Sequence, residues 1–452
     1  MSPIGGPYKS MQAIILTGGN GALLRPLTFS TPKPLLPLLN QPILQYIIRL
    51  LIQQEASEII VAANYRSELV FSWINQQQWP VPVRGHAVDE YRGSAQVLWD
   101  MRDQLAERFL VIFADTLVDL PMKVAFDAFS ESGAAVWMGL SADSDPFSPA
   151  SLRVQDGVAT ALIPGPLESG STATDLASDG RFYFLTRDVI TQYGETTANI
   201  FPDVASELIT ANGSMPVVAA PGFWSVLGRL EPYLDANFTL LSQLGISYVD
   251  PRATVHPSAV IHGPALIGPD CHIGENSVVG PYVVMGPNIQ VGSDTTIQHS
   301  MVFTAVRIGA GVHIDRSVIG FSATVEEGVS IAPLCIVGAY TCIGANSKLA
   351  SGSRVGPNLS VAPDSHIADI LFPPDPLNED NDNTQSAQYK GLAAIEYDVF
   401  RVISLTGDIT AAQIALKLDL PSESVIPILS TLVHRSLLIR SESGETRFSV
   451  RP

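Results

Sequence analysis

Two different hydrophobic periodicities divide the chain near residue 250. Before residue 245, short apolar, β-rich runs alternate with longer segments of helical period; the runs lie at 13–16, 59–63, 109–113 and 134–140, and the helical segments include 42–53 and 94–105. This alternation predicts a mostly parallel sheet covered by helices on both faces. We therefore expect one α/β domain, with a Rossmann-like mixed sheet, over residues 11–245.

Between residues 250 and 368, branched apolar residues recur at every sixth position. A six-residue step fits one short flat face of a triangular prism whose aliphatic side chains point inward. The pattern resembles the left-handed β-helix of hexapeptide-repeat proteins, with about six coils, and we expect Phe303 and Tyr340 on its outer faces. The series shifts register twice and consists of Val255, Ile261, Ile267, Ile273, Val279, Met285, Val291, Ile297, Val302, Ile308, Ile314, Ile319, Val325, Ile331, Val337, Ile343, Leu349, Val355, Val361 and Ile367.

The remaining residues fall into a linker and a small domain. Residues 369–390 are acidic, rich in Pro and Asn, and aperiodic, which is typical of a linker. Residues 391–452 predict helices at 395–405, 410–418 (capped by Thr410) and 422–436, then a turn at 443–444 between two strands. This order resembles a winged helix-turn-helix. The segment holds six Lys/Arg against seven Asp/Glu, so we expect protein contacts or subunit assembly rather than DNA binding.

Composition narrows the classes of function. The chain has 452 residues, 46% of them hydrophobic, and a formal net charge of −18. Such a charge repels nucleic acid and anionic membranes, so any phosphate site must be local. Three cysteines do not make a disulfide framework. The first ten residues lack the features of a secretory signal and no apolar run is long enough to span a bilayer, so we expect a cytoplasmic protein with no membrane contact.

The densest candidate chemistry lies near the N-terminus, in residues 16–28 (LTGGNGALLRPLT), 31–36 (TPKPLL) and 40–44 (NQPIL). A glycine turn after a buried strand lets backbone N–H groups approach phosphate closely. Together these blocks resemble the sugar-1-phosphate nucleotidyltransferases, which join a nucleoside triphosphate to a sugar 1-phosphate and release pyrophosphate. The resemblance continues at 90–95 (EYRGSA), 113–116 (FADT), 222–224 and 233–237, and many members carry a C-terminal left-handed β-helix.

The resemblance implies roles for individual residues. Lys33 and Asp115 are the candidate catalytic residues, and Asp115 is the candidate ligand of a Mg²⁺ ion that binds with the nucleotide. Structural alternatives remain open at these positions: a bare tight turn, a solvated lysine, a strand-end hydrogen bond and an ordinary helix cap. The residues expected to contact a nucleoside triphosphate or nucleotide sugar are Gly18, Gly19, Gly21, Arg25, Lys33, Glu90, Gly93 and Ser94.

Three family charges are missing from this sequence. Leu23 stands where the family has the arginine of Gly-Thr-Arg, Gly165 where it has the lysine of Glu-Lys-Pro, and Val226 where it has its second metal-binding Asp. The family reaction is an in-line displacement, catalysed mainly by positioning and charge neutralisation. Losing one preorganised donor typically costs about 10²–10³ in rate.

Three hypotheses follow from this balance of retained and missing residues. The first is a catalytically impaired protein that binds nucleotide sugars and acts in regulation or assembly, as a homo-oligomer or with an active paralogue. The second is an active sugar-1-phosphate nucleotidyltransferase of unusual specificity. The third is a transcriptional regulator that uses the degenerate domain as its sensor.

Overall fold

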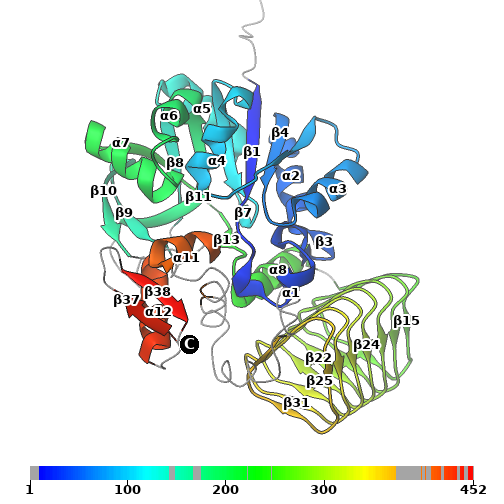
Figure 1. Cartoon of the computed structure of the whole chain (residues 1–452). Helices are drawn as coiled ribbons and strands as arrows, with labels where there is room; N and C mark the ends of the chain where they lie inside the picture. Colours follow the sequence, from blue (N-terminus) through cyan, green and yellow to red (C-terminus); the bar gives the residue numbers. More distant parts are fainter. Residues whose placement is uncertain are drawn as a thin grey trace, which may run out of the picture.

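The protein is described by a computed structural model that covers an N-terminal α/β domain, a β-helix and part of a small C-terminal unit (Figure 1). The described residues are 10–141, 148–165, 175–220, 222–245 and 247–372, then 399, 403, 409–418, 422–434, 438–441 and 446–450. Among them, no helix has the length and apolar character needed to cross a membrane. Most of the predicted linker, from residue 373 onward, lies outside the described residues.

A mixed sheet forms the centre of the N-terminal domain. Within the described residues it has nine strands in the order β5-β4-β1-β6-β11-β8-β12-β10-β9. The segment from β5 to β6 is parallel, and β11 joins it antiparallel to β6. All four predicted apolar runs lie in or overlap strands of this sheet. The bounds are β1 (Met11–Thr17), β4 (Ala56–Ala63), β5 (Val83–Ala87), β6 (Arg108–Phe113), β8 (Val136–Ser141), β9 (Ala150–Gln155), β10 (Val158–Pro164), β11 (Leu176–Thr186) and β12 (Met215–Ala219).

Helices cover both faces of this sheet, as the sequence predicts. One core cluster joins Ala13 and Ile15 of β1 to α2 (Ile43–Gln53), α3 (Ser67–Gln76), α5 (Met122–Ser132) and α8 (Leu230–Leu244). A second cluster joins Ile14 and Leu16 to α4 (Ser94–Asp100), α6 (Arg187–Tyr193) and α7 (Ala205–Asn212). Successive side chains of a strand point to opposite faces, so a strand covered on both sides is apolar throughout.

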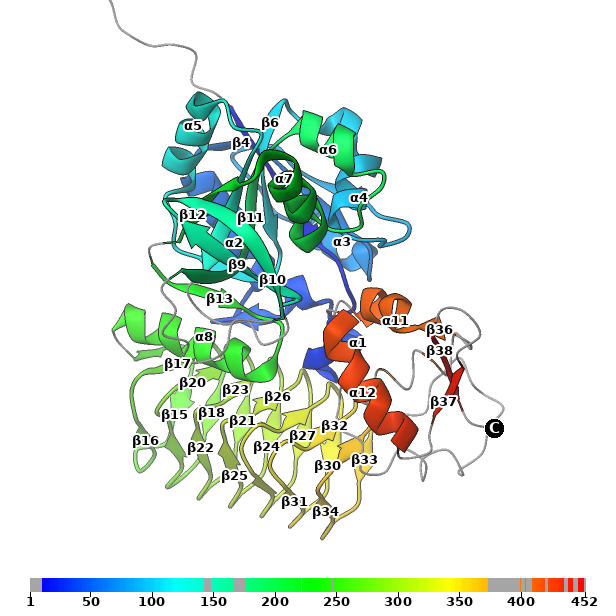
Figure 2. The ribbon, with the colours of Figure 1, turned by 90° about the vertical axis from the view of Figure 1, so that its left-hand side faces the viewer.

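The β-helix consists of three parallel sheets, which contain eight, seven and seven strands within the described residues (Figure 2). It runs from β14 (Tyr248–Val249) to β35 (Ile370–Leu371) and therefore has about one coil more than the six expected. Every residue of the six-residue series lies in or packs against one continuous apolar core, so the predicted inward positions are confirmed. At the register shifts, hydrogen-bonded residues on neighbouring coils are 17 rather than 18 positions apart.

One sheet of the β-helix packs against the N-terminal domain. Val284, Met301, Val318 and Ile336 alternate with the inward residues and join the same core cluster as α8. Phe303 belongs to this contact and is only 3% exposed, so the expectation that it lies on an open face was wrong. The neighbouring domain covers that face, which the repeat pattern alone does not reveal. Tyr340 is 64% exposed, as expected.

The C-terminal unit contains α11 (Ala411–Leu418), α12 (Ser422–His434), β36 (Ile409–Thr410), β37 (Leu438–Ser441) and β38 (Arg447–Val450), with the strands paired antiparallel in the order β36-β38-β37. Thr410 caps α11, as predicted: Gln413 N donates to Thr410 Oγ1 at 3.3 Å, and Thr410 N donates to Gln413 Oε1 at 3.1 Å. The helix predicted at 395–405 lies outside the described residues except for 399 and 403.

Candidate functional site

The glycine turn leaves the carboxyl end of β1 and folds back on itself. Gly21 is left-handed, with φ 64°, and a Cβ there would lie 2.7 Å from the side chain of Thr28. Thr28 Oγ1 donates a hydrogen bond to Gly21 O at 2.9 Å. The chain continues through the short helices η1 (Ala22–Leu24) and α1 (Leu27–Ser30). Only glycine adopts this turn without strain or a clash, which explains its place in the motif.

The 90–95 segment reaches the glycine turn through Tyr91. The Tyr91 ring lies directly on Gly18, where a Cβ would come within 2.2 Å of it. Ser94 is buried and accepts the N–H of Ile200 at 2.9 Å; it is the first residue of α4 rather than its cap. A Cβ at Gly93 would come within 2.1 Å of a backbone oxygen in the 198–200 segment. Glu90 is exposed.

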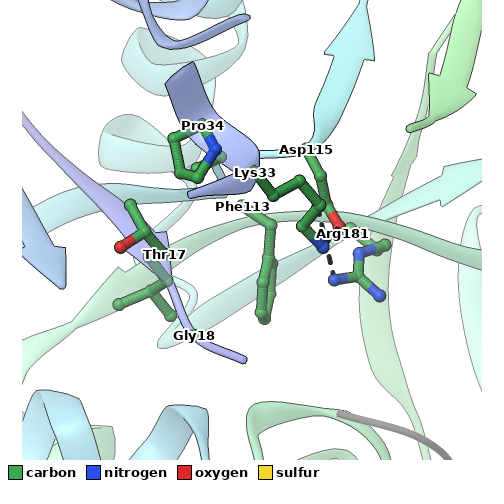
Figure 3. A pocket seen from close by; sticks show the side chains of 9 residues that line it. Thr17, Gly18, Lys33, Pro34, Phe113, Asp115 and Arg181 are labelled. Carbon is green, nitrogen blue, oxygen red and sulfur yellow. Dashed lines mark hydrogen bonds and ion pairs between the residues drawn. The ribbon is translucent and has the colours of Figure 1, made fainter. Parts of the chain in front are cut away.

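Three charged side chains meet at the centre of the site (Figure 3). Lys33 Nζ lies 2.6 Å from Asp115 Oδ2, and Arg181 Nη2 lies 3.4 Å from Asp115 Oδ1. The Asp115 side chain is 5% exposed. Both oxygens of one buried carboxylate therefore face cations.

Three separate elements bring these charges together. Lys33 begins the short helix η2 (Lys33–Leu35), Asp115 follows β6, and Arg181 lies on β11. The backbone of Asp115 is fixed as well, because its carbonyl accepts the N–H of Leu227 at 2.8 Å. The side chains and backbone enclose a small pocket lined by Leu16, Thr17, Gly18, Lys33, Pro34, Phe113, Ala114, Asp115 and Arg181.

An irregular stretch of β11 holds Arg181 in place. Its φ is 57°, a left-handed value that is uncommon for residues with a side chain. Asp179 stabilises this conformation: its Oδ1 accepts the N–H of Arg181 at 3.0 Å, and its Oδ2 accepts the hydroxyl of Tyr183 at 2.6 Å. The guanidinium then lies over the Phe113 ring, 4.4 Å from the ring centre, where stacking favours a cation.

The two cations determine the protonation state of Asp115. Burial by itself would raise the pKa of this carboxyl, but Arg181 and then Lys33 outweigh burial and hold the pKa well below its usual range. Asp115 is therefore ionised throughout the physiological range. For Tyr183, burial and the neighbouring Asp179 raise the pKa well above its usual value, so that hydroxyl remains a donor.

This arrangement does not fit Mg²⁺. The ion needs carboxylate oxygens in its first shell, and both oxygens of Asp115 already contact cations. In the part of the chain that the structure describes, no three His, Cys, Asp or Glu side chains are grouped so that they could hold a metal. Val226, in β13 (Trp224–Val226), pairs with Thr116, the first residue of β7 (Thr116–Val118) and the neighbour of Asp115. The position expected for the second carboxylate thus lies at the site and holds valine.

Only some of the residues predicted from the sequence to bind the nucleotide or to act in catalysis line this pocket. Gly18, Lys33 and Asp115 line the pocket, whereas Gly19, Gly21, Arg25, Glu90, Gly93 and Ser94 do not. Arg25 is 7% exposed and lies over the Phe29 ring at 4.9 Å. Sequence reasoning missed Arg181. The sequence does contain an indication of its role, because Arg181 directly precedes the apolar run 182–185. An arginine at the end of a buried strand needs a charged or polar partner.

Comparisons with known proteins match the two large domains of the chain. Residues 12–243 match the family model described as "Nucleotidyl transferase", and residues 245–368 match the model of the "EIF2B subunit epsilon LbH domain". Mannose-1-phosphate guanylyltransferase 1 of Arabidopsis thaliana is 25% identical over 240 residues, which are 52% of this chain and 66% of that enzyme. The mannose-1-phosphate guanylyltransferase catalytic subunit beta of Xenopus tropicalis is 34% identical over 118 residues, 25% of this chain and 33% of that subunit.

A solved structure, HddC from Yersinia pseudotuberculosis in complex with GMP-PN, is 20% identical with a TM-score of 0.42 and covers 51% of this chain and 99% of that one. The chain spans slightly less than two thirds of the Arabidopsis relative. The nucleotidyl transferase model, in contrast, covers more than half of this chain, from the strand before the glycine turn to the end of α8. The chain therefore belongs to the nucleotidyl transferase family.

Proposed function

We propose that this protein binds a nucleoside triphosphate or nucleotide sugar in its N-terminal domain and turns it over very slowly or not at all. On this proposal it is a cytoplasmic protein of sugar-nucleotide metabolism that acts in regulation or assembly. The observation that carries the proposal is the state of Asp115, which pairs with Lys33 and Arg181 while Val226 occupies the adjacent strand.

The missing charges belong to three different segments. Leu23 lies in η1, where its carbonyl accepts a hydrogen bond from Arg354 of the β-helix at 2.9 Å. Gly165 follows β10 with φ 89°, and Val226 ends β13. These segments correspond to the triphosphate, the sugar phosphate and the metal in the family resemblance. Neutralising charge at each of the three accelerates phosphoryl transfer, so the rate falls with every charge lost, whereas binding can persist with the retained glycine turn and Lys33.

A two-part experiment tests this function. Thermal shift with a panel of nucleotides and nucleotide sugars detects binding, and a pyrophosphorolysis assay with Mg²⁺ detects turnover. We expect binding and no turnover above background. Turnover at ordinary enzyme rates, roughly 1–10³ per second, contradicts the proposal.

Restoring the missing charges gives a second readout. A protein that carries Leu23→Arg and Val226→Asp regains two of them at unstrained positions and should gain measurable pyrophosphorolysis. Adding Gly165→Lys completes the set, but the φ of 89° disfavours any side chain there, even though among the described residues, apart from its chain neighbours, no atom lies within 4 Å of where a Cβ would be. The double variant is therefore the cleaner test, and the triple variant follows it.

Similarity to the guanylyltransferases favours a second candidate. The order of the motifs along the chain supports an active sugar-1-phosphate nucleotidyltransferase, and the matched relatives are named as mannose-1-phosphate guanylyltransferases. Formation of GDP-mannose from mannose 1-phosphate and GTP by the unmodified protein would distinguish this active enzyme from the impaired binding protein. A Mg²⁺ ion would then have to displace at least one cation from Asp115.

Assembly is the third part of the proposal. One matched relative is named as a catalytic subunit, and the β-helix model is named after a subunit. We propose a homo-oligomer or a complex with an active paralogue, and a winged-helix-like C-terminal unit that contacts protein rather than DNA. Light scattering that shows a clean monomer with no co-purifying partner contradicts the assembly. A gel shift with DNA at moderate salt would instead favour a transcriptional regulator.

A further inference from the structure

The first coil of the β-helix presents three unpaired strand edges. Its strands are the terminal strands of the three sheets within the described residues (Figure 2). Each later coil accepts backbone N–H groups from the coil before it; Ile267 O, for example, accepts the N–H of Asp250 at 3.0 Å. The equivalent carbonyl of the first coil, that of Val249, receives no N–H from the described backbone. The strands that form this rim are β14 (Tyr248–Val249), β15 (Thr254–Val255) and β16 (Val260–Ile261).

Exposed apolar side chains gather at the rim. Among the described residues nine large apolar side chains are exposed, and four of them lie in the rim strands or at the end of α8 just before them. These four are Leu244, Tyr248, Val249 and Val260. Val249 pairs with Ile267 in the next coil, yet Val249 is 36% exposed whereas Ile267 is fully buried. The difference arises because Ile267 has a coil on either side and Val249 has a coil on one side only. The rim therefore exposes the end of a hydrophobic core.

The rim strands lack the features that prevent edge-to-edge pairing. Proteins that keep a sheet edge unpaired place charged residues or proline in the edge strand, or cover the edge with another element. The six residues of the rim strands include no charged residue and no proline. No other strand in the described part of the chain pairs with them at that edge. Such an edge is a template for pairing with another chain.

A second copy of this chain has the matching edge. A two-fold axis across the β-helix places two rims face to face with their strands antiparallel, so that one strand pairs with its own copy and the other two pair with each other. The alternating N–H and C=O groups of the two edges then complement each other.

The charge of the rim also favours a second copy. The chain has a net charge of −18, but residues 247–264 contain only one Asp and one Arg and no Lys or Glu. Arg252 lies 3.6 Å from Asp250 and 3.5 Å from Asp270, so these charges offset one another locally. Two strongly acidic copies can therefore meet at this surface with little local repulsion.

We propose that two copies of this chain associate rim to rim, so that their β-helices continue as one stack through antiparallel pairing of the rim strands. The inference rests on the proposed assembly and names the surface that makes it. Both views place the first coil at the end of the β-helix away from the C-terminal unit (Figure 1, Figure 2), which leaves that unit outside the contact. The end of one coil is a small surface compared with a typical stable interface, so the dimer should dissociate on dilution.

Sedimentation velocity of the full-length protein over a series of concentrations measures this association. The decisive variant carries Val249→Lys and Val260→Lys, which put the kind of charge that protects natural edges on two exposed rim positions. We expect its dimer affinity to fall about tenfold or more, because like charges meet across the two-fold axis. The matched control carries Val124→Lys and Tyr340→Lys, two exposed apolar positions away from the rim, and should dimerise like the unmodified protein. Melting temperatures report whether each variant folds.

Cross-linking tests proximity without adding charge to the rim. The two-fold axis makes one rim strand the neighbour of its own copy, so at least one of Tyr248→Cys, Thr254→Cys and Val260→Cys should join two copies through a short bismaleimide. Each is made in a background that carries Cys342→Ser, because Cys342 is partly exposed whereas Cys271 and Cys335 are buried. Tyr340→Cys in the same background should not cross-link.

The outcomes separate this inference from the proposed function. A protein that is monomeric at every concentration overturns the inference and leaves a paralogue complex as the proposed assembly. A dimer that persists in the rim variant, without any rim cross-link, overturns the rim contact but leaves assembly through another surface. Equal loss of the dimer in the control variant shows a general effect of added charge and also overturns the inference. Thermal shift with nucleotides on the same proteins reports nucleotide binding independently of the rim.

Discussion

Asp115 illustrates how a residue's role depends on neighbours distant in the sequence. The motif resemblance made it a candidate metal ligand. The structure instead places its two oxygens against Lys33 and Arg181, which are 82 and 66 positions away in the chain. A buried carboxylate between two cations is an anchor, and removing it leaves both cations without that partner in a poorly hydrated place.

Asp115→Asn should therefore destabilise the folded protein by about 3 kcal/mol at pH 7. Urea unfolding followed by tryptophan fluorescence measures the difference from wild type. Asp175→Asn is the matched control, because Asp175 belongs to an exposed ion pair and should change stability by no more than about 0.5 kcal/mol. Equal effects of the two substitutions would contradict a buried anchor.

The same variant should reveal a pH dependence. The pKa of Asp115 is lower in the folded protein than in the unfolded chain, so ionised Asp115 favours folding. Its contribution is complete above about pH 5 and declines as the pH falls below about 4. We expect the gap between wild type and Asp115→Asn to be constant from pH 7 to 5 and to narrow in more acidic solution. A gap that stays constant at pH 3.5 would argue against this linkage.

At the scale of elements, the inward stack of aliphatic side chains stabilises the β-helix. The burial of an outward side chain depends instead on whether another part of the protein packs on that face. Inward residues are buried from Ile267 to Val361, and the residues at the two ends of the series, Val255, Ile261 and Ile367, are partly buried against the same core. Outward residues follow no such rule. Phe303 is covered by the N-terminal domain, whereas Tyr340 is open to solvent.

Two substitutions three residues apart test this difference. Ile343→Asp places a charge in the fully buried stack and should cost several kcal/mol, because no partner can reach it. Tyr340→Asp introduces the same charge at an exposed position and should change stability by no more than about 0.5 kcal/mol. Thermal melting of the two proteins gives the comparison, and an Ile343→Asp protein as stable as wild type would refute the repeat assignment.

At the scale of the whole molecule, side-chain contacts join the β-helix to the loop that follows the glycine turn. Arg354, in one of the last coils, donates hydrogen bonds to the carbonyls of Leu23 and Arg25, just after the glycine turn. Phe372 contacts the Phe29 ring, with their centres 5.0 Å apart. The loop after the glycine turn is thus held on one side by β1 and on the other by the β-helix.

Arg354→Gln should loosen this loop without unfolding either domain. We expect amides of residues 24–31 to exchange hydrogen about tenfold faster, as for the loss of about 1.4 kcal/mol of local stability. Hydrogen exchange with mass spectrometry resolves this segment. Arg307→Gln, an exposed arginine elsewhere on the β-helix, is the control and should leave exchange there unchanged. An identical pattern in both variants would show that the two domains do not hold the loop together.

The sequence by itself determined what depends on local periodicity and short motifs. The six-residue step identified the inward stack of the β-helix, because each coil repeats the same burial. Alternating apolar runs located β1, β4, β6 and β8, and the glycines marked a turn that no larger residue fits. Thr410 was recognisable as a cap because capping requires only four consecutive residues.

Only the tertiary structure decided the rest, because those features join distant segments. Arg181 enters the site through an irregular strand whose conformation depends on Asp179 and on the Phe113 ring. The burial of Phe303 and the link from Arg354 to the glycine turn depend on how two domains meet. A sequence pattern records which side chains are apolar or charged. The partner that satisfies each charge is fixed only when the chain folds.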